Sequence, residues 1–346
     1  MPDNRLTVIM PVRNQAPYIS AAVTSVLEQS FSCFDLVVID DASTDDTVNI
    51  LKASQDKRLQ VIVNERNLGL AASLNRALEG VSSQYIARMD GDDLCSPERL
   101  AKQVEFMDAR PEISISGSFV RRFSAKGSYV LRYPQGAECL RSYVLFGNPL
   151  AHPSVIIRRE DILKSGFKYD ESCGAGQDYE LWSRCLRKLN ADNIPEPLVD
   201  WRESTSSVTS SNFSQSNKQA LAILSGELQR LGICLSVQDL NFHRQVGNGS
   251  GMRSIDELIK AEAWLHKIEN ENSRTNAYPD RGLSEAAAFL WFRICLNSSG
   301  MGLNVLNKYF RSSFQHAYRP TPSELSTFLL NGFIRMRRDP AGRISE

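Results

Sequence analysis

The chain has 346 residues, a length that fits one large domain or two of ordinary size. Hydrophobic residues make up 42% of it and charged residues 23%, which is normal for a globular protein with a real core. The 40 basic and 40 acidic residues cancel, so the composition argues against a protein that binds nucleic acid through bulk charge.

Three features bear on the compartment. The seven cysteines are odd in number and none are paired at C-x-x-C spacing, which argues against zinc and against a disulfide framework. Residues 1–5 are short and polar, unlike a signal peptide. The apolar run at 286–296 is interrupted by Arg293 and is too short to cross a bilayer. We therefore expect a soluble cytoplasmic protein, with peripheral attachment to the inner face of the plasma membrane left open.

The first part of the chain alternates between strand-like and helix-like stretches. Ser43, with Asp46 three residues later, is expected to cap the second helix, and Ser96 followed by Pro97 is expected to open the fourth. Such alternation predicts an α/β fold with a doubly wound, mostly parallel sheet and helices on both faces. Apolar runs predict strands at 6–10, 36–39, 59–63 and 85–89, and helical spacing predicts helices at 19–27 and 70–79.

From residue 113 onward the regular alternation of strand-like and helix-like stretches ends. A Gly-rich segment, 174–178, precedes a helix, and the Ser-, Thr- and Asn-rich stretch 204–217 is typical of a linker or mobile loop. Short strands are expected at 113–117, 155–157 and 199–202, and helices at 220–231, 255–268 and 284–296.

These patterns predict two parts, a catalytic domain at 1–205 and a mainly helical region at 206–346. We expect the second part to shape an acceptor site or to form an oligomer or membrane contact. Thr321 and Glu324 have the spacing of a capping box. The segment 328–338 mixes apolar residues with arginines, so it is either an amphipathic helix on an anionic membrane or, as we favour, a helix docked on the core.

Three carboxylates gather at residues 90–93, directly after a predicted strand. Two unit charges about 4 Å apart repel by roughly 4 kcal/mol at an effective dielectric of about 20, and hard oxygen ligands suit Mg²⁺ or Mn²⁺. A solvated Asp-Gly turn is the alternative. Because Asn14 and the pair Asp40 and Asp41 also follow strands, all these side chains should meet where such sheets bind ligands. This convergence favours the metal site.

Several phosphate- and metal-binding motifs are absent. The loop after the first strand, 11–15, contains no glycine, so the dinucleotide-binding fingerprint is missing there, and no Walker A sequence occurs. An EF-hand beginning at Asp90 fails because Cys95 replaces its glycine and Ala101 its closing glutamate. Dinucleotide oxidoreductases and P-loop enzymes are therefore disfavoured.

Four segments in order, 8–14, 38–45, 67–70 and 89–93, resemble the inverting family 2 glycosyltransferases of the GT-A fold, of the bacterial cell-surface polysaccharide type. The resemblance covers the predicted catalytic domain and does not clearly extend beyond it. It implies transfer of a sugar from a nucleotide-diphospho-sugar, most often UDP-linked, to a glycan or glycolipid acceptor. It also implies Mn²⁺ or Mg²⁺ as the cofactor, because the diphosphate leaves as an anion.

The resemblance also implies roles for individual residues. Pro11 and Arg13 would line the base and ribose pocket, and Asp40 or Asp41 would accept from the base. Asp90 and Asp92 would form the D-x-D element that touches the ribose and the metal. The full set implied for the donor is Pro11, Arg13, Asn14, Asp40, Asp41, Asn67, Gly69, Asp90 and Gly91, with Asp92 and Asp90 as metal ligands.

Asp178 falls where the family has the aspartate that acts as general base, a role that inversion needs to remove the acceptor proton. The alternative is that Asp178 only caps a helix. This sequence departs from the family at Gln177, which replaces a glutamate, and at Arg13, which replaces an aromatic residue. Whether His152 and Asp93 contact the metal or diphosphate stays open here.

Two other functions remain as alternatives. A sugar nucleotidyltransferase shares the general architecture, but it would need a Gly-rich phosphate loop that 11–15 does not provide. A non-catalytic module that only binds nucleotide-sugars is the other, and the aspartates at 90–93 together with Asp178 argue against it.

Overall fold

The computed structural model describes residues 5–203 and 213–334. The chain forms two compact units, one made of Met1–Ala137 and Asn148–Ala220 and the other of Glu138–Gly147 and Leu221–Glu346. The division after Ala220 lies beyond the boundary expected at 205. Sequence patterns also gave no sign that Glu138–Gly147 belongs with the C-terminal helices.

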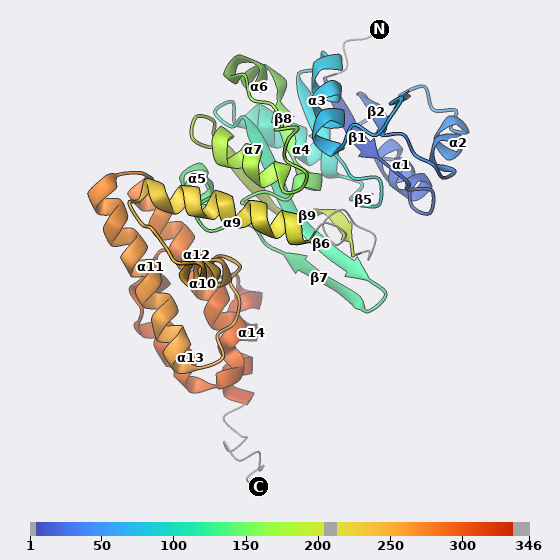
Figure 1. Ribbon diagram of the computed structural model, residues 1–346. Coiled ribbons are helices and arrows are strands. Elements are labelled where there is room, and N and C mark those ends of the chain that lie inside the picture. The colour runs from blue at the N-terminus through green and yellow to red at the C-terminus, as the bar shows by residue number, and fades with distance from the viewer. Residues whose placement is uncertain (1–4, 204–212, 335–346) are drawn as a thin grey trace. The chain divides into compact units, whose positions relative to one another are not determined.

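The first unit is built on one nine-stranded sheet in the order β3-β2-β1-β4-β8-β6-β9-β5, with β7 paired to β6 (Figure 1). The strands β1 to β4 are mutually parallel where they pair, which confirms the predicted doubly wound half. Beyond β4 the sheet is mixed, since β8 is antiparallel to both its neighbours and β6 is parallel to β9. The strands are β1 (Leu6–Val12), β2 (Phe34–Asp40), β3 (Leu59–Val63), β4 (Tyr85–Arg88), β5 (Leu94–Cys95), β6 (Ile115–Ser124), β7 (Gly127–Leu131), β8 (Ile156–Arg158) and β9 (Ala191–Arg202).

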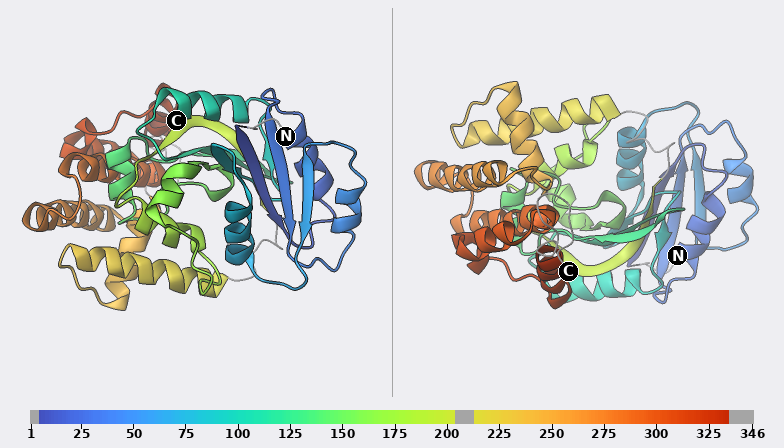
Figure 2. Two further views of the ribbon diagram at one scale, coloured as in Figure 1. Left: turned by 90° about the horizontal axis from the view of Figure 1, so that it is seen from above. Right: turned by 90° about the horizontal axis from the view of Figure 1, so that it is seen from below.

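Helices cover both faces of the parallel half, with α1 and α2 on one side of β1 to β3 and α3 on the other (Figure 2). Every residue of β1 is buried, as a strand between two helical layers requires. The remaining helices of this unit occur in the sequence between the strands of the mixed half. The helices are α1 (Ile19–Leu27), α2 (Thr47–Lys52), α3 (Leu70–Gly80), α4 (Arg99–Ala109), α6 (Arg159–Ser165) and α7 (Gln177–Cys185), with the short turn η1 (His152–Ser154).

Two predicted helix starts are wrong. The helix α2 begins at Thr47, and the Ser43 hydroxyl instead accepts the backbone N–H of Asn14 at 2.8 Å. The helix α4 begins at Arg99 with no side-chain cap, and Ser96 contributes only its carbonyl, which accepts the Arg99 backbone N–H at 3.0 Å. The Ser43 hydroxyl is therefore occupied by a long-range contact that a local capping rule does not foresee.

The last strand of the sheet is far longer than the four residues expected. β9 contains Pro195 and Pro197, which lack the N–H that a strand interior donates. The register with β6 accordingly shifts between Ser118 and Val120, so the ladder bulges past the prolines and then resumes to Arg202. Because of these prolines, the sequence pattern does not indicate the full strand. After the bulge the pairing resumes, and Arg202 follows Asp200, which pairs with Leu94 at the start of β5.

The second unit is helical, and its core surrounds α12, in which Trp291 and Phe292 are completely buried. The capping box is confirmed, because the Glu324 backbone N–H donates to the Thr321 hydroxyl at 3.3 Å and the Glu324 carboxylate accepts the Thr321 N–H at 2.9 Å. The helices that lie wholly or mostly in this unit are α5 (Ala137–Tyr143), α9 (Phe213–Arg230), α10 (Val237–Gly247), α11 (Ile255–Thr275), α12 (Asp280–Ser298), α13 (Leu303–Arg311) and α14 (Pro322–Ile334), with the turns η2 (Ser299–Met301) and η3 (Ser313–His316).

Two predicted segments fall partly outside the described residues. In the expected linker 204–217, residues 204–212 lie outside them, and α9 begins at Phe213. In the segment 328–338, Phe328 is fully buried, which agrees with a helix docked on the core, while the arginines from 335 onward lie outside. Within the described part of the chain, none of the helices has both the length and the apolar character needed to cross a bilayer.

Candidate active site

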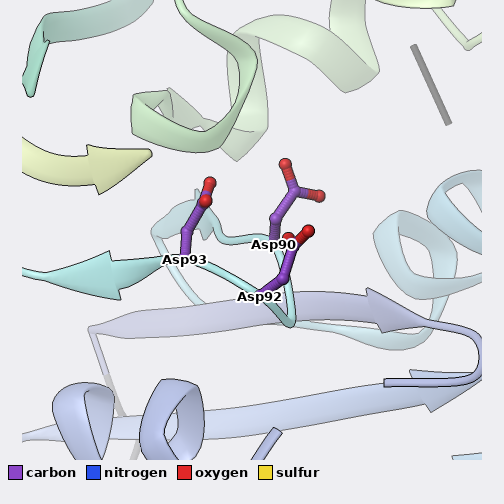
Figure 3. A group of neighbouring side chains, drawn as sticks. All are labelled: Asp90, Asp92 and Asp93. Atoms are coloured by element: carbon purple, nitrogen blue, oxygen red, sulfur yellow. The ribbon is translucent and has the colours of Figure 1, made fainter. Parts of the chain in front are cut away.

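The acidic loop, residues 90–93, joins β4 to β5 and holds the carboxylates of Asp90, Asp92 and Asp93 close together (Figure 3). One oxygen from each lies within 4.8 Å of the others. Gly91 makes this turn possible, because a Cβ there would lie 2.6 Å from Val12 Cγ1 at the end of β1. The loop is therefore packed directly onto the first strand of the parallel half.

Arg88 fixes the first carboxylate of the acidic loop. Its side chain is only 3% exposed, and Nη1 donates to Asp90 Oδ2 at 2.6 Å while Nη2 donates to Oδ1. This two-pronged pairing is the strong form of an arginine–carboxylate contact. Sequence reasoning missed it, although the signal was there: at the end of a strand, residues two apart project to the same face.

Asp92 and Asp93 are held where burial opposes their charge. Burial and the charge of Asp90 raise the pKa of Asp92 to about 6. Burial and the charges of Asp90 and Asp92 raise the pKa of Asp93 well above its usual range. Asp93 Oδ1 accepts the backbone N–H of Arg202 at 2.8 Å, whereas Oδ2 is buried with no hydrogen-bond partner among the described residues.

A divalent cation fits this set of donors. Three crowded carboxylates, one with a buried oxygen that lacks a partner, need a compensating charge, and Mg²⁺ and Mn²⁺ prefer such oxygen ligands. In the sequence, β5 lies between Asp93 and the start of α4, so Asp93 is not part of the first turn of that helix.

Arg99 is a second buried cation behind the acidic loop, and it also was not predicted. Its side chain is 0% exposed. Nη2 donates to the Arg88 carbonyl at 2.6 Å, and Nη1 lies 3.1 Å from Met89 Sδ and 3.3 Å from Cys95 Sγ. Because Arg88 and Met89 precede the loop and Cys95 follows it, this guanidinium holds both ends of the loop in place.

Arg202 closes the other side of the loop. Its Nε donates to the Asp92 carbonyl at 2.8 Å. The guanidinium lies between the rings of Tyr18 and Phe123, at 4.7 and 4.6 Å from their centroids. The Arg202 side chain therefore contacts the acidic loop itself, in addition to its packing against these rings.

The structure separates the roles of Asp40 and Asp41. Both oxygens of Asp41 are used: Oδ1 accepts from Asn64 Nδ2 and the Leu68 N–H at 2.8 Å each, and Oδ2 accepts the Gly69 N–H at 2.9 Å. Asp40 is 0% exposed, and its Oδ1 accepts the Ser43 N–H at 2.9 Å. Its Oδ2 is buried and unpartnered within the described ranges.

The loop that carries Asn67 and Gly69 is thus positioned by Asp41. Gly69 has φ +88°, a left-handed conformation that strains other residues, and its N–H also reaches Asn67 Oδ1 at 3.1 Å. The positive φ explains why position 69 is glycine, and the hydrogen bond from its N–H explains why position 67 is asparagine.

The loops after β1 and β2 are joined to each other. The backbone N–H of Thr44 donates to Asn14 Oδ1 at 2.8 Å, and the Asp41 N–H donates to the Val12 carbonyl at the same distance. Pro11 is buried within β1, whereas Arg13 is exposed beside this junction. The predicted donor residues of the first two strands therefore do lie at one edge of the sheet.

Asp178 is the second residue of α7, whose N-cap is Gly176, so the interpretation that Asp178 caps the helix is wrong. Its Oδ2 accepts from Asn148 Nδ2 at 2.7 Å. Burial raises the pKa of Asp178, and the N–H of Tyr179, the charge of Arg88 and the Asn148 contact oppose that rise. Asp178 is a partly buried, oriented carboxylate, which suits the role of a general base.

His152 is occupied by structural contacts. It is 7% exposed, and its Nε2 shares a hydrogen bond of 2.9 Å with the Tyr169 hydroxyl. The ring meets Trp182 edge-on, and burial together with the charge of Arg88 lowers the pKa of His152 well below its usual value. The imidazole is therefore neutral, and these contacts favour a structural role over contact with diphosphate.

Comparison with known proteins agrees with this geometry. Residues 7–167 match the model of glycosyl transferase family 2. The chain is 31% identical over 229 residues to the putative glycosyltransferase EpsE of Bacillus subtilis (strain 168), an alignment that covers 63% of this chain and 80% of that protein. It is 30% identical over 210 residues to the O-antigen biosynthesis glycosyltransferase WbnJ of Escherichia coli, which covers 57% and 79%.

Solved structures share the fold. The crystal structure of S. aureus TarS 1–349 in complex with UDP-GlcNAc aligns with a TM-score of 0.56 over 88% of this chain and 89% of that one, at 18% identity. At that identity the likeness concerns the fold alone, and it confirms the GT-A architecture. The relatives at higher identity settle the family: the chain belongs to glycosyl transferase family 2 and is a glycosyltransferase.

Proposed function

We propose that the protein is a metal-dependent, inverting glycosyltransferase. It moves a sugar from a UDP-linked donor to a glycan or glycolipid acceptor in surface polysaccharide biosynthesis. The observation that carries this proposal is the acidic loop, in which Asp92 and the unpartnered oxygen of Asp93 are crowded within reach of a single cation. The biosynthetic context is supported by the relative WbnJ, whose name assigns it to O-antigen biosynthesis.

Asp92 is the proposed principal metal ligand. Both oxygens of Asp90 already accept hydrogen bonds from Arg88, so Asp90 is better placed to contact the donor than to hold the ion alone. Asp93 would offer its free Oδ2. A bound Mn²⁺ or Mg²⁺ supplies the positive charge that stabilises a diphosphate leaving group. Arg202, fixed against the Asp92 carbonyl, would add a second positive charge at the acidic loop.

Asp40, rather than Asp41, is the proposed acceptor for the nucleotide base. An uracil ring presents an N–H donor, and Asp40 is the member of the pair with a buried oxygen still free. Asp41 contributes indirectly by holding the loop with Asn67 and Gly69. Pro11, Arg13 and Asn14 lie on the adjoining strand end, where we place the ribose.

Asp178 is the proposed general base. The acceptor hydroxyl oxygen forms a bond to the anomeric carbon while the bond from that carbon to the diphosphate oxygen breaks. The hydroxyl proton passes to the Asp178 carboxylate, and the nucleoside diphosphate leaves. Asn148 orients the carboxylate through Oδ2, and a raised pKa makes the anion a stronger base once it is formed.

The alternatives are less well supported. A sugar nucleotidyltransferase is disfavoured by relatives named as glycosyltransferases over most of their own length. A module that only binds nucleotide-sugars would not need a carboxylate oriented as Asp178 is by Asn148. For the helical unit we keep the proposal of an acceptor, oligomer or peripheral membrane contact, to which Leu330 and Phe333 on α14, more than half exposed, would contribute.

The test is a donor screen followed by product analysis. Isothermal titration of the full chain with UDP, GDP and CDP, each with and without Mn²⁺, should show UDP binding that requires the metal. The protein is then incubated with UDP-sugars and with lipid-linked or free glycan acceptors. NMR should show that the anomeric configuration of the product is opposite to that of the donor. A product with retained configuration contradicts the mechanism, and metal-independent UDP binding contradicts the role of the loop.

A further inference from the structure

The helix α3 is anchored at its start to the proposed donor side of the site. Its N-cap residue, Gly69, and the preceding Leu68 donate their N–H groups to Asp41. Asn64 adds a second link, since its Nδ2 donates to Asp41 Oδ1 at 2.8 Å and to the Ser73 hydroxyl on α3 at 3.0 Å. The first turns of α3 are therefore fixed relative to the carboxylate that holds the donor loop.

Further along the same helix, Asn75 binds the loop between α6 and α7, residues 166–176. Its side chain is 6% exposed. Nδ2 donates to the Tyr169 carbonyl and to Glu171 Oε1, and Oδ1 accepts the Tyr169 N–H, each at 2.9 Å. Asparagine is not a strong helix former, but its amide offers two donors and an acceptor together. These three bonds account for an asparagine in the interior of α3.

A second contact between α3 and the α6–α7 loop is weaker. Glu79 pairs with Lys168 Nζ at 2.6 Å, but the two side chains are 62% and 63% exposed. Ion pairs exposed to this extent contribute little to stability. Within the described part of the chain, the buried amide of Asn75 is therefore the stronger of these two links.

The α6–α7 loop leads directly into α7, whose second residue is Asp178. The loop is a compact turn rather than slack chain. Asp170 Oδ1 accepts from the N–H and the hydroxyl of Ser172 at 2.9 and 2.7 Å, and the Asp170 carbonyl accepts the Cys173 N–H at 3.0 Å. Because these contacts stiffen the loop, a displacement at Tyr169 should be passed on to the start of α7.

We propose that Asn75 is a positioning residue for the general base, because it holds the α6–α7 loop on α3 and so fixes Asp178 relative to the loop that Asp41 holds. This inference rests on the proposed function of Asp178. All three bonds of the Asn75 amide go to the α6–α7 loop, so their loss should leave the donor loops in place. It should let Asp178 shift, and a misplacement of about 1 Å can slow a reaction about a hundredfold.

Two substitutions at this position test the proposal. Asn75→Ala removes all three bonds, and Asn75→Asp keeps only the acceptor. In both variants kcat should fall about ten- to a hundredfold, while isothermal titration should give a UDP–Mn²⁺ affinity within about twofold of the wild type. Hydrogen exchange measured by mass spectrometry should be faster in peptides from residues 166–178. A general loss of structure would not separate turnover from donor binding in this way.

The matched control is Asn272→Ala, in α11 of the second unit. Asn272 Nδ2 donates to the Tyr278 carbonyl at 3.0 Å and to Asp280 Oδ1 at 2.8 Å, and its Oδ1 accepts the Tyr278 N–H at 2.9 Å. The substitution therefore removes the same three kinds of bond from another buried asparagine. It should lower the melting temperature by a similar amount, yet change neither kcat nor the hydrogen exchange of residues 166–178.

Milder changes at Glu171 keep the proposal testable if Asn75→Ala does not fold. Glu171 is exposed, and Glu171→Ala loses one of the three bonds, so kcat should fall about threefold. Glu171→Gln keeps an oxygen that can accept from Asn75 and should transfer sugar as the wild type does.

Several outcomes would overturn the positioning role. These are a wild-type kcat or unchanged loop exchange in Asn75→Ala (or in Glu171→Ala, if the former does not fold), an equal loss of kcat in Asn272→Ala, and a loss of UDP affinity that matches the loss of kcat. Failure of the proposed function is distinguishable, because it would appear without any change at Asn75. The wild type would then transfer no sugar, or Asp178→Asn would transfer it at the wild-type rate.

Discussion

The backbone N–H of Arg202 donates to Oδ1 of Asp93 at 2.8 Å, across 109 positions of sequence. This contact ties the end of β9 to the acidic loop, and the Arg202 side chain reinforces it through the Asp92 carbonyl. One oxygen of Asp93 is therefore committed to structure and the other is free. The acidic loop is thus tied directly to the end of β9 in the mixed half of the sheet.

The first prediction concerns the metal. Asp92→Asn should abolish Mn²⁺-dependent UDP binding, because it removes the charge of the principal ligand from a loop whose other carboxylates are partly committed. Isothermal titration with and without Mn²⁺ measures this directly. The exposed Asp256→Asn, at the start of α11, is the control and should bind normally. Full metal-dependent binding by Asp92→Asn would remove this residue from the site.

The second prediction concerns the base. Asp178→Asn should bind UDP and Mn²⁺ as the wild type does but should transfer sugar at least about a hundredfold more slowly, the usual scale of general base catalysis. The asparagine can still accept from Asn148, so the local fold should persist. Transfer at a rate near that of the wild type would mean that another group takes the proton.

The pH dependence of transfer follows from the same residue. Burial raises the pKa of Asp178, and a base is inactive when protonated, so activity should be complete above that pKa and fall as the pH drops through it. The midpoint should lie above 3.8, the ordinary value for aspartate. Measuring kcat from pH 4 to 8 at saturating donor tests this, and UDP–Mn²⁺ titrations at each pH distinguish loss of the base from loss of the metal.

Much of this site could be predicted from sequence because its residues follow strands. Apolar runs fixed the positions of β1, β2 and β4, and parallel packing then required Asn14, Asp40 and the acidic loop to share one edge. The donor loops indeed join through Asn14 and Thr44. Short apolar runs in the sequence were therefore sufficient to predict where the residues at the strand ends meet.

What could not be predicted depends on contacts between distant residues. The Ser43 hydroxyl serves Asn14, 29 positions away, so a local capping rule misassigned it. Arg202 reaches the loop only because β9 resumes after two prolines, and no local pattern marks that. Arg88 is the exception: its spacing from Asp90 is visible in the sequence, but only the structure shows that its side chain is buried and pairs with that carboxylate.

The adjacent aspartates should respond differently to substitution. Asp41→Asn should lower the free energy of unfolding by about 1–3 kcal/mol, because an amide cannot accept the N–H bonds of both Leu68 and Gly69 in place of the carboxylate. Asp40→Asn should instead weaken UDP binding with a smaller loss of stability. Urea unfolding and UDP titration of both variants compare them, and equal effects would contradict the assignment of Asp40 to the base.

Gly91 gives the sharpest test of how the acidic loop is held. An alanine there would place its Cβ 2.6 Å from Val12 Cγ1 and 3.4 Å from Ile19 Cδ1, so the loop or β1 must move. Gly91→Ala should cost about 1–3 kcal/mol of unfolding free energy and should weaken Mn²⁺-dependent UDP binding. The control is Gly80→Ala, where a Cβ meets nothing within 4 Å, and which should leave both quantities unchanged or slightly raise stability. Adding Val12→Ala to Gly91→Ala removes the clashing methyl and should restore metal-dependent binding; if it does not, the loop depends on something other than this contact.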